Sequence, residues 1–326
     1  MRYLASLFLL LTTFSAAPVA RSQTQFPPPS FASPERIIID TDIGDDIDDA
    51  FAIALALRSP ELQILGISTT FGDTEARARI LDRLLGENAR RDIPVLAGTA
   101  TQTKNPMSQR VYGDAARFTR AFHPAAMDFI LEQIRNNPGQ ITLVAIGPLI
   151  NIGALLDRDP QTFLKLKRVV LMGGSVHCGY SEVGLCPGPP PVPEWNILND
   201  IPSAQKLFRS GVPLYVMPLD STQLKFNESM RSYVFRQGTP LTDALTLLYH
   251  EWNQPTPTLF DPMTIAYILN PQICPTEPMH ITVDEKGFTR PESGTPNAQV
   301  CLHSDSDAFF HLLLTRLVPS PKSVSP

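Results

Sequence analysis

This 326-residue chain has only one long, mostly apolar stretch, and no stripe of lysine or arginine occurs anywhere in it. The apolar stretch, Leu4 to Phe14, has about eleven residues, whereas a helix needs ~20 to span a bilayer. Acidic and basic residues are spread along the sequence, and the net charge is only −5. We therefore expect neither a membrane anchor nor a nucleic-acid partner.

Cysteine is also scarce, and its spacing argues against a zinc site. The chain has four cysteines and none of the Cys-x-x-Cys pairs that are typical of zinc ligands. An even number of cysteines in an exported protein indicates disulfides, and the pairing that the spacing favours is Cys178–Cys186 with Cys274–Cys301. The first pair would close a short loop. Other pairings and free thiols are also consistent with the sequence.

The two ends of the chain differ from the long region between them. Residues 1–22 have a charged start at Arg2, the apolar stretch and small residues suited to cleavage, so we predict a signal peptide and a periplasmic or secreted protein. Residues 23–34 form a proline-rich lead-in, and residues 319–326 a disordered tail. No linker or repeat interrupts residues 35–318, which predicts one large domain.

The most informative segment is an acidic turn between an apolar run and an alanine-rich run. A strand over Ile37–Ile39, an acidic turn and a helix over Ala50–Ala56 place carboxylates at the carboxyl end of a strand, where open α/β sheets bind ligands. Like charges this dense repel each other, and a divalent metal ion bound through oxygen atoms is the simplest stabilising partner. The alternative is a solvated acidic loop. Six aspartates lie in the turn: Asp40, Asp42, Asp45, Asp46, Asp48 and Asp49.

Strand-like and helix-like segments alternate through the rest of the chain. This order predicts an α/β fold with an open, mostly parallel sheet, helices on both faces and right-handed crossovers. The segment 177–193 has five prolines and three glycines and is expected to be a loop. The strand-like segments are 62–70, 94–96, 141–146, 168–172 and 214–217, and the helix-like segments are 74–91, 124–136, 203–210 and 241–252.

Two further motifs place polar side chains where the chain returns from strand ends. Glu194-Trp195-Asn196 follows the proline-rich loop, and Asp261-Pro262 opens a helix-like segment. Each acid has an ordinary alternative role as a helix cap. The indoles of Trp195 and Trp252 could stack on a flat ligand or simply pack in the core.

Five motifs occur in the order found in the nucleoside hydrolases, a family often labelled inosine–uridine-preferring, and the chain resembles that family from about Ile37 to Leu317. The resemblance implies a calcium-dependent enzyme that cleaves the N-glycosidic bond of ribonucleosides to free base and ribose, and the predicted signal peptide would make this chain an exported member. It also implies a homodimer or homotetramer, as is common for that fold. The motifs are Asp40-Thr41-Asp42 with Asp48-Asp49-Ala50, Gly147-Pro148-Leu149, Leu171-Met172-Gly173-Gly174, Glu194-Trp195-Asn196 and Asp261-Pro262.

The resemblance further implies a set of metal ligands. Asp42 is expected to bind Ca²⁺ and to accept a proton from the attacking water. Asp49 matches a bidentate ligand, and Asp261 the distal ligand from the other end of the chain. A backbone carbonyl just after Gly147-Pro148-Leu149 falls on Ile150. Oxygen ligands of this kind suit a hard cation.

The same resemblance assigns substrate contacts. Asp48 matches the carboxylate that binds ribose hydroxyls, and Glu194 and Asn196 match the pair that holds the 5′ and 3′ hydroxyls. Met172 and Trp195 belong to the same motifs and are expected at the substrate. Carboxylates stabilise the positive charge that develops on a sugar as its bond to nitrogen breaks.

The residues expected to donate a proton to the departing base differ from those of the better-known members of the family. Those carry histidine before the distal aspartate, where this chain has Phe260, which cannot donate a proton. Tyr112, followed by Gly113, and His177 are the candidate proton donors, with Tyr249 and His250 as further choices. Base preference, purine or pyrimidine, therefore stays open.

Two other positions also differ from the family pattern. The acidic turn is two residues longer than its short form, so that Asp45 or Asp46 could join the ligands. Asp73 stands where many members have asparagine and is expected at the substrate.

Three alternatives compete with a hydrolase of ordinary nucleosides. A phosphohydrolase of the haloacid-dehalogenase type also begins with Asp-x-Asp after a strand, but the acids and lysine it needs downstream do not accompany Asp220. A calcium-stabilised nucleoside- or sugar-binding protein would keep the sugar pocket without turnover. A hydrolase of a modified ribosyl compound would keep the chemistry and change the leaving group.

Overall fold

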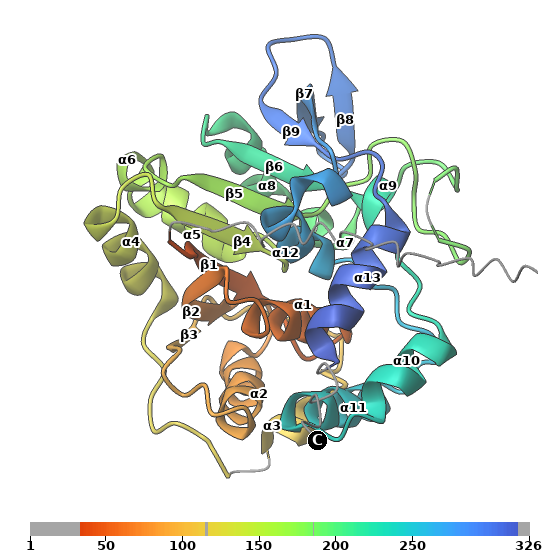
Figure 1. Cartoon of the computed structure of the whole chain (residues 1–326). Helices are drawn as coiled ribbons and strands as arrows, with labels where there is room; N and C mark the ends of the chain where they lie inside the picture. The colour runs from red at the N-terminus through yellow and green to blue at the C-terminus, as the bar shows by residue number, and fades with distance from the viewer. Residues whose placement is uncertain (1–32, 115–116, 185, 319–326) are drawn as a thin grey trace, which may run out of the picture. The chain divides into compact units, whose positions relative to one another are not determined.

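The computed structural model describes residues 33–114, 117–184 and 186–318 (Figure 1). The predicted signal peptide (1–22), nearly all of the lead-in (23–34) and the tail (319–326) lie outside these residues. Among the described helices, none is both long and apolar enough to cross a membrane.

Nine strands form one sheet in the order β3-β2-β1-β4-β5-β6-β9-β7-β8. Neighbours from β3 to β9 are parallel, and β7 runs antiparallel to both β9 and β8. The prediction of an open, mostly parallel sheet is therefore confirmed. The strands are β1 (Glu35–Thr41), β2 (Leu62–Thr69), β3 (Val95–Ala97), β4 (Ile141–Ala145), β5 (Arg168–Met172), β6 (Leu214–Met217), β7 (Glu277–Val283), β8 (Thr289–Glu292) and β9 (Ala298–Val300).

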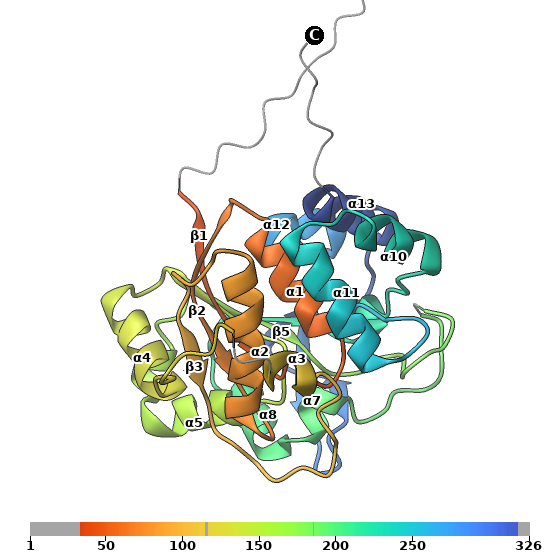
Figure 2. The same cartoon turned by 90° about the horizontal axis from the view of Figure 1, so that it is seen from below.

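Helices cover both faces of the sheet, as Figure 2 shows from below. Alternate side chains of β1 enter two separate cores, Ile37 and Ile39 in one and Ile38 in the other. This alternation is what a strand buried on both faces requires. The first core is packed by α1 (Asp48–Leu57), α2 (Thr74–Glu87), α10 (Glu228–Phe235), α11 (Pro240–Trp252), α12 (Pro262–Leu269) and α13 (Ser306–Leu317), and the second by α4 (Ala126–Asn136), α5 (Ile150–Arg158), α6 (Pro160–Phe163) and α8 (Ile201–Arg209).

The predicted end of one long helix and the set of predicted strands need correction. Helix α2 ends at Glu87 and not at Arg91, because Asn88 donates its side-chain amide to the Leu84 carbonyl (2.8 Å) and Ala89 takes a left-handed conformation. The antiparallel hairpin β7–β8 was not foreseen. Most of β8 is exposed and polar, so it carries no hydrophobic signal.

The loop after β5 has no helix or strand among its described residues before α7 (Trp195–Leu198), as predicted. A disulfide between Cys178 and Cys186 closes it, with the two Cα atoms 5.9 Å apart. Cys274 and Cys301 form the second disulfide, with Cα atoms 5.6 Å apart. The favoured pairing is thus confirmed.

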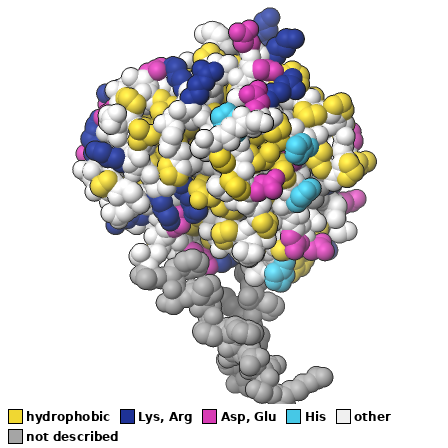
Figure 3. Space-filling model, turned by 90° about the horizontal axis from the view of Figure 1, so that it is seen from above, with side chains coloured by type: hydrophobic (Ala, Val, Ile, Leu, Met, Phe, Trp, Pro, Cys, Tyr) yellow, Lys and Arg dark blue, Asp and Glu magenta, His cyan; other side chains and the backbone are white. Residues whose placement is uncertain are grey.

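Side chains of both charges are interspersed with apolar ones on the face seen in Figure 3.

The buried side chain of His123 joins the loop before α4 to helix α2. Its Nδ1 lies 2.8 Å from a Glu75 oxygen and its Nε2 lies 3.0 Å from an Asp82 oxygen. The hydrogen bond to Asp82, helped by Glu75, raises the pKa of His123 above its ordinary value.

The raised pKa of His123 makes its contribution to stability pH-dependent. The contribution is fully present below the unfolded pKa near 6.5 and is lost as the pH rises through the higher folded value. We expect His123→Asn to lower the free energy of unfolding by about 1–2 kcal/mol at pH 6 and by much less at pH 9. Urea unfolding measures both, with His250→Asn, on an exposed residue, as control. Equal losses at the two pH values would contradict this assignment.

Candidate active site

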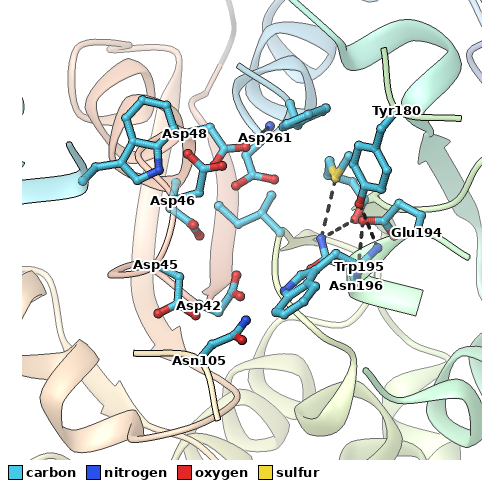
Figure 4. Close-up of a pocket in the computed structure, with 15 residues that line it drawn as sticks. Asp42, Asp45, Asp46, Asp48, Asn105, Tyr180, Glu194, Trp195, Asn196 and Asp261 are labelled. Atoms are coloured by element: carbon cyan, nitrogen blue, oxygen red, sulfur yellow. Dashed lines mark hydrogen bonds between the residues drawn. The ribbon is translucent and has the colours of Figure 1, made fainter. Parts of the chain in front are cut away.

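A cavity of about 350 Å³ opens at the carboxyl ends of β1, β4 and β5. Figure 4 shows its labelled aspartates on one side, facing Tyr180, Glu194 and Asn196 on the other. The cavity is lined by Asp42, Asp45, Asp46, Asp48, Asp49, Asn105, Ile146, Met172, Tyr180, Glu194, Trp195, Asn196, Trp252, Phe260 and Asp261.

Three carboxylates meet at the floor of the cavity. Each of Asp48, Asp49 and Asp261 offers one oxygen, and these oxygens lie within 4.8 Å of one another. Asp48 and Asp49 occupy the first turn of α1, where the helix dipole favours negative charge. The Thr41 hydroxyl donates to Asp49, and the Asp261 amide donates to Asp48 (3.3 Å). Two distant parts of the chain are thereby joined at one point.

Burial raises the free energy of the ionised forms of these carboxyl groups. Asp48, Asp49 and Asp261 are at most 5% exposed, and burial, with the neighbouring carboxylates, raises the pKa of each well above its ordinary value. Burial raises the pKa of Asp42 to about 7, Asp45 adds to the rise, and the Arg77 guanidinium opposes it. Closely spaced, buried carboxylate oxygens fit the donor set of a hard divalent cation.

Arg77 is a buried cation behind the acidic turn that the motifs did not reveal. Its side chain is 1% exposed and lies 2.8 Å from an Asp45 oxygen. It also donates to the backbone carbonyls of Phe71 (2.7 Å), Ile43 (3.0 Å) and Asp42. One guanidinium therefore ties the turn after β1 to the turn after β2.

The opposite wall is built on α7. Glu194, 2% exposed, accepts hydrogen bonds from the backbone amides of Asn196 (3.0 Å) and Gly174 (3.0 Å). The Asn196 side chain donates to the Met172 carbonyl (3.0 Å). Glu194 is thus a helix cap, as the ordinary alternative proposed, and it also lines the cavity. Burial raises the pKa of Glu194 to about 7, although the amides oppose the rise.

Aromatic rings surround the mouth. Trp195 is 37% exposed and Tyr180 is 44% exposed. The Trp195 amide donates to the Tyr180 hydroxyl (3.0 Å), and the Tyr180 ring meets the Phe260 ring edge-on at 6.0 Å between centroids. Trp252 also lines the cavity and is partly exposed. The rim is therefore aromatic, while the floor is acidic.

Eight of the predicted site residues come together in this cavity: Asp42, Asp48, Asp49, Met172, Glu194, Trp195, Asn196 and Asp261. Four do not line it. Tyr112 is fully buried and donates its hydroxyl to Glu87 (2.7 Å), while Asp73 caps α2 and pairs with Arg110. His177 is exposed, and its backbone amide donates to Asp220. The structure gives none of these three side chains a place at the cavity.

The fourth predicted site residue that does not line the cavity is Ile150, which lies in the first turn of α5. Ile146, on the other side of Gly147-Pro148-Leu149, lines the cavity in its place. The rule that ligands bind at strand ends could have identified Ile146, which directly follows β4. Asn105 and Tyr180 lie in loops without a motif, so the sequence held no comparable signal for them.

The family profile described as "Inosine-uridine preferring nucleoside hydrolase" matches residues 37–311. The chain belongs to this family. It is an N-ribosyl hydrolase that cleaves the N-glycosidic bond of ribonucleosides, and the phosphohydrolase alternative is excluded.

Relatives of this nucleoside hydrolase match over most of its length. A pyrimidine-specific ribonucleoside hydrolase, RihA of Salmonella gallinarum, is 31% identical over 86% of this chain and 97% of its own. The uncharacterized protein C1683.06c of Schizosaccharomyces pombe is 32% identical over 86% and 98%. Among solved structures, the plant nucleoside hydrolase PpNRh1 is 25% identical, with a TM-score of 0.74 over 88% of this chain and 100% of that one.

The buried position of Arg77 in this nucleoside hydrolase predicts a large effect on stability. Arg77→Met leaves Asp45 and three carbonyls without their donor, so we expect a loss of about 3–5 kcal/mol in the free energy of unfolding. Arg77→Lys keeps the charge and should lose clearly less. Guanidinium chloride unfolding of both variants measures the difference. Equal losses would show that the buried charge is unimportant.

Proposed function

We propose that this nucleoside hydrolase acts with a calcium ion held at the floor of the cavity. The observation that carries the proposal is the group of three buried carboxylates, Asp48, Asp49 and Asp261, whose oxygens lie within 4.8 Å of one another. Desolvated like charges at this spacing are stabilised by a divalent cation that prefers oxygen ligands. Asp49 and Asp261 are the proposed side-chain ligands, together with Asp42.

The proposed backbone ligand is the carbonyl of Ile146. Ile146 lines the cavity and follows the last residue of β4, whereas Ile150 lies outside the cavity. Bound calcium would orient the ribose hydroxyls and lower the pKa of the attacking water.

The chain's own residues then divide the remaining work. Asp42, which lines the cavity beside the carboxylates of its floor, takes the proton of the attacking water. Asp48 accepts hydrogen bonds from ribose hydroxyls, and Glu194 and Asn196 hold the sugar from the opposite wall. Fixing the sugar between two rigid walls brings its reacting carbon to the water. The surrounding carboxylates stabilise the positive charge of the transition state.

Export is part of the proposal. The signal-like residues 1–22 suggest passage across a membrane, and two disulfides suit an oxidising compartment.

The base preference of the enzyme stays open, because similar proteins differ in it. RihA is named as pyrimidine-specific, whereas a fold relative from Gardnerella vaginalis, with a TM-score of 0.72, is named as purine-preferring. A panel of purine and pyrimidine nucleosides, assayed for free base with calcium and with chelator, tests the function and identifies the base.

Asp49→Asn tests the metal assignment. Changes outside the ligand shell of a metal already cost 10–100-fold, so we expect loss of a ligand to lower activity at least about 100-fold and to abolish calcium binding. In chelator, the same variant should melt at a higher temperature than the wild type, because one buried repulsion is removed. Calorimetric titration with Ca²⁺ and thermal unfolding measure these effects, with Asp157→Asn as an exposed control. A variant that is active and binds calcium would refute the assignment.

The raised carboxyl pKa values predict how calcium stabilisation depends on pH. Without metal, the folded protein binds more protons than the unfolded chain between about pH 4 and pH 7, so these groups lower stability as the pH rises. Calcium needs the ionised forms, so the increase in melting temperature that it causes should be larger at pH 8 than at pH 5. Thermal unfolding of metal-free and calcium-loaded protein measures this increase. An increase that is equal at both pH values would count against a carboxylate site.

A further inference from the structure

The cavity is lined by more carboxyl groups than its proposed metal could balance. Seven of its lining side chains are carboxylic acids, and none of its described lining residues is lysine, arginine or histidine. The nearby guanidinium of Arg77 is engaged with Asp45 and with backbone carbonyls. One calcium ion and one guanidinium therefore leave an excess of carboxylates around any bound substrate.

The three carboxylates that lie closest together are less exposed than the aromatic side chains of the cavity. Asp48, Asp49 and Asp261 are at most 5% exposed and form the floor, where the ribose would bind. Trp195 and Tyr180 are 37% and 44% exposed and stand at the mouth. A riboside with its sugar on the floor therefore places its base among aromatic rings. Such rings attract flat cations through the negative charge of their faces.

The charge of the base also decides whether the base must gain a proton as it leaves. When the bond from the ribose C1′ to a neutral base breaks, its electron pair stays on the base, which leaves as an anion unless it gains a proton. When the base is a cationic heterocycle, the same electron pair neutralises the ring nitrogen. Water then forms the new C1′–O bond and releases one proton, so the base itself needs no proton.

Resting on the proposed function, we infer that the preferred substrates are ribosides of cationic nitrogen heterocycles, that is, N-ribosylpyridinium ions and N7-alkylated purine nucleosides. The excess of carboxylates attracts the cation, the aromatic rim binds its flat ring, and its bond breaks without an acid at the base. Asp46 and Trp252, both in the cavity lining, are the residues expected to select for charge.

Two matched pairs of substrates test the inference at pH 8 with calcium present. Nicotinamide riboside is compared with its neutral dihydro form, and 1,7-dimethylguanosine, which has no acidic proton at N1 and stays cationic at pH 8, with 1-methylguanosine. We expect kcat/KM for the cationic member to exceed that for the neutral member at least tenfold in each pair. Neutral members that are cleaved as fast as their cationic partners would overturn the inference.

Variants separate recognition from the greater intrinsic reactivity of the cations. Asp46→Asn removes one charge without changing the size of the side chain, and Trp252→Leu removes a ring. We expect each to lower the cationic-to-neutral ratio of kcat/KM at least threefold, whereas the exposed control Asp157→Asn leaves it unchanged. A ratio that is the same in all variants would assign the preference to the substrates alone and overturn the inference.

The same assay distinguishes failure of the proposed function. No base released from any of the four compounds would overturn both the function and the inference. Cleavage of the cationic members that persists in chelator, with the ratio still sensitive to Asp46→Asn, would refute the metal role and support charge selection.

Discussion

The mutual repulsion of buried carboxylates at the junction of β1 and α1 is the constraint on which the rest of the site depends. Asp48, Asp49 and Asp261 are almost inaccessible to solvent, and their carboxyl oxygens crowd into one small region. Such an arrangement is unfavourable by itself, and it persists because the surrounding fold holds it. The N-terminus of α1 and the Arg77 guanidinium offset part of the repulsion. In the proposed function, the remaining repulsion gives the site its affinity for cations, whether a metal ion or a sugar that becomes positively charged.

The opposite wall shows how one residue can serve both the fold and the site. Glu194 uses both carboxyl oxygens to accept backbone amides from α7 and from the turn after β5. These bonds fix the carboxylate at the edge of the cavity and position Asn196 beside Met172. A cap that is rigid for structural reasons is thereby available to orient a substrate without further loss of conformational entropy. The two walls come from opposite sides of β4, so the sheet itself sets the width of the cavity.

Much of this arrangement could be predicted from the sequence, and the failures have physical causes. Strands β5 and β6 were predicted with the observed bounds, because a parallel strand buried on both faces reads as a continuous apolar run. The acidic cluster was recognisable because its charges follow such a strand. Tyr112 was expected at the site, but its hydroxyl found a buried partner in Glu87 that no local pattern could reveal. Tyr180 and Asn105 reach the cavity from irregular loops, whose paths depend on tertiary contacts and, for Tyr180, on a disulfide.

A crystal structure of the protein with calcium and ribose tests the central claim most directly. The account predicts one ion on the floor of the cavity, 2.3–2.6 Å from oxygens of Asp49 and Asp261. It also predicts the ribose hydroxyls between that ion and the wall of Glu194 and Asn196. Carboxylates that turn away from one another around water, with no ion and with the ribose bound elsewhere, would contradict it.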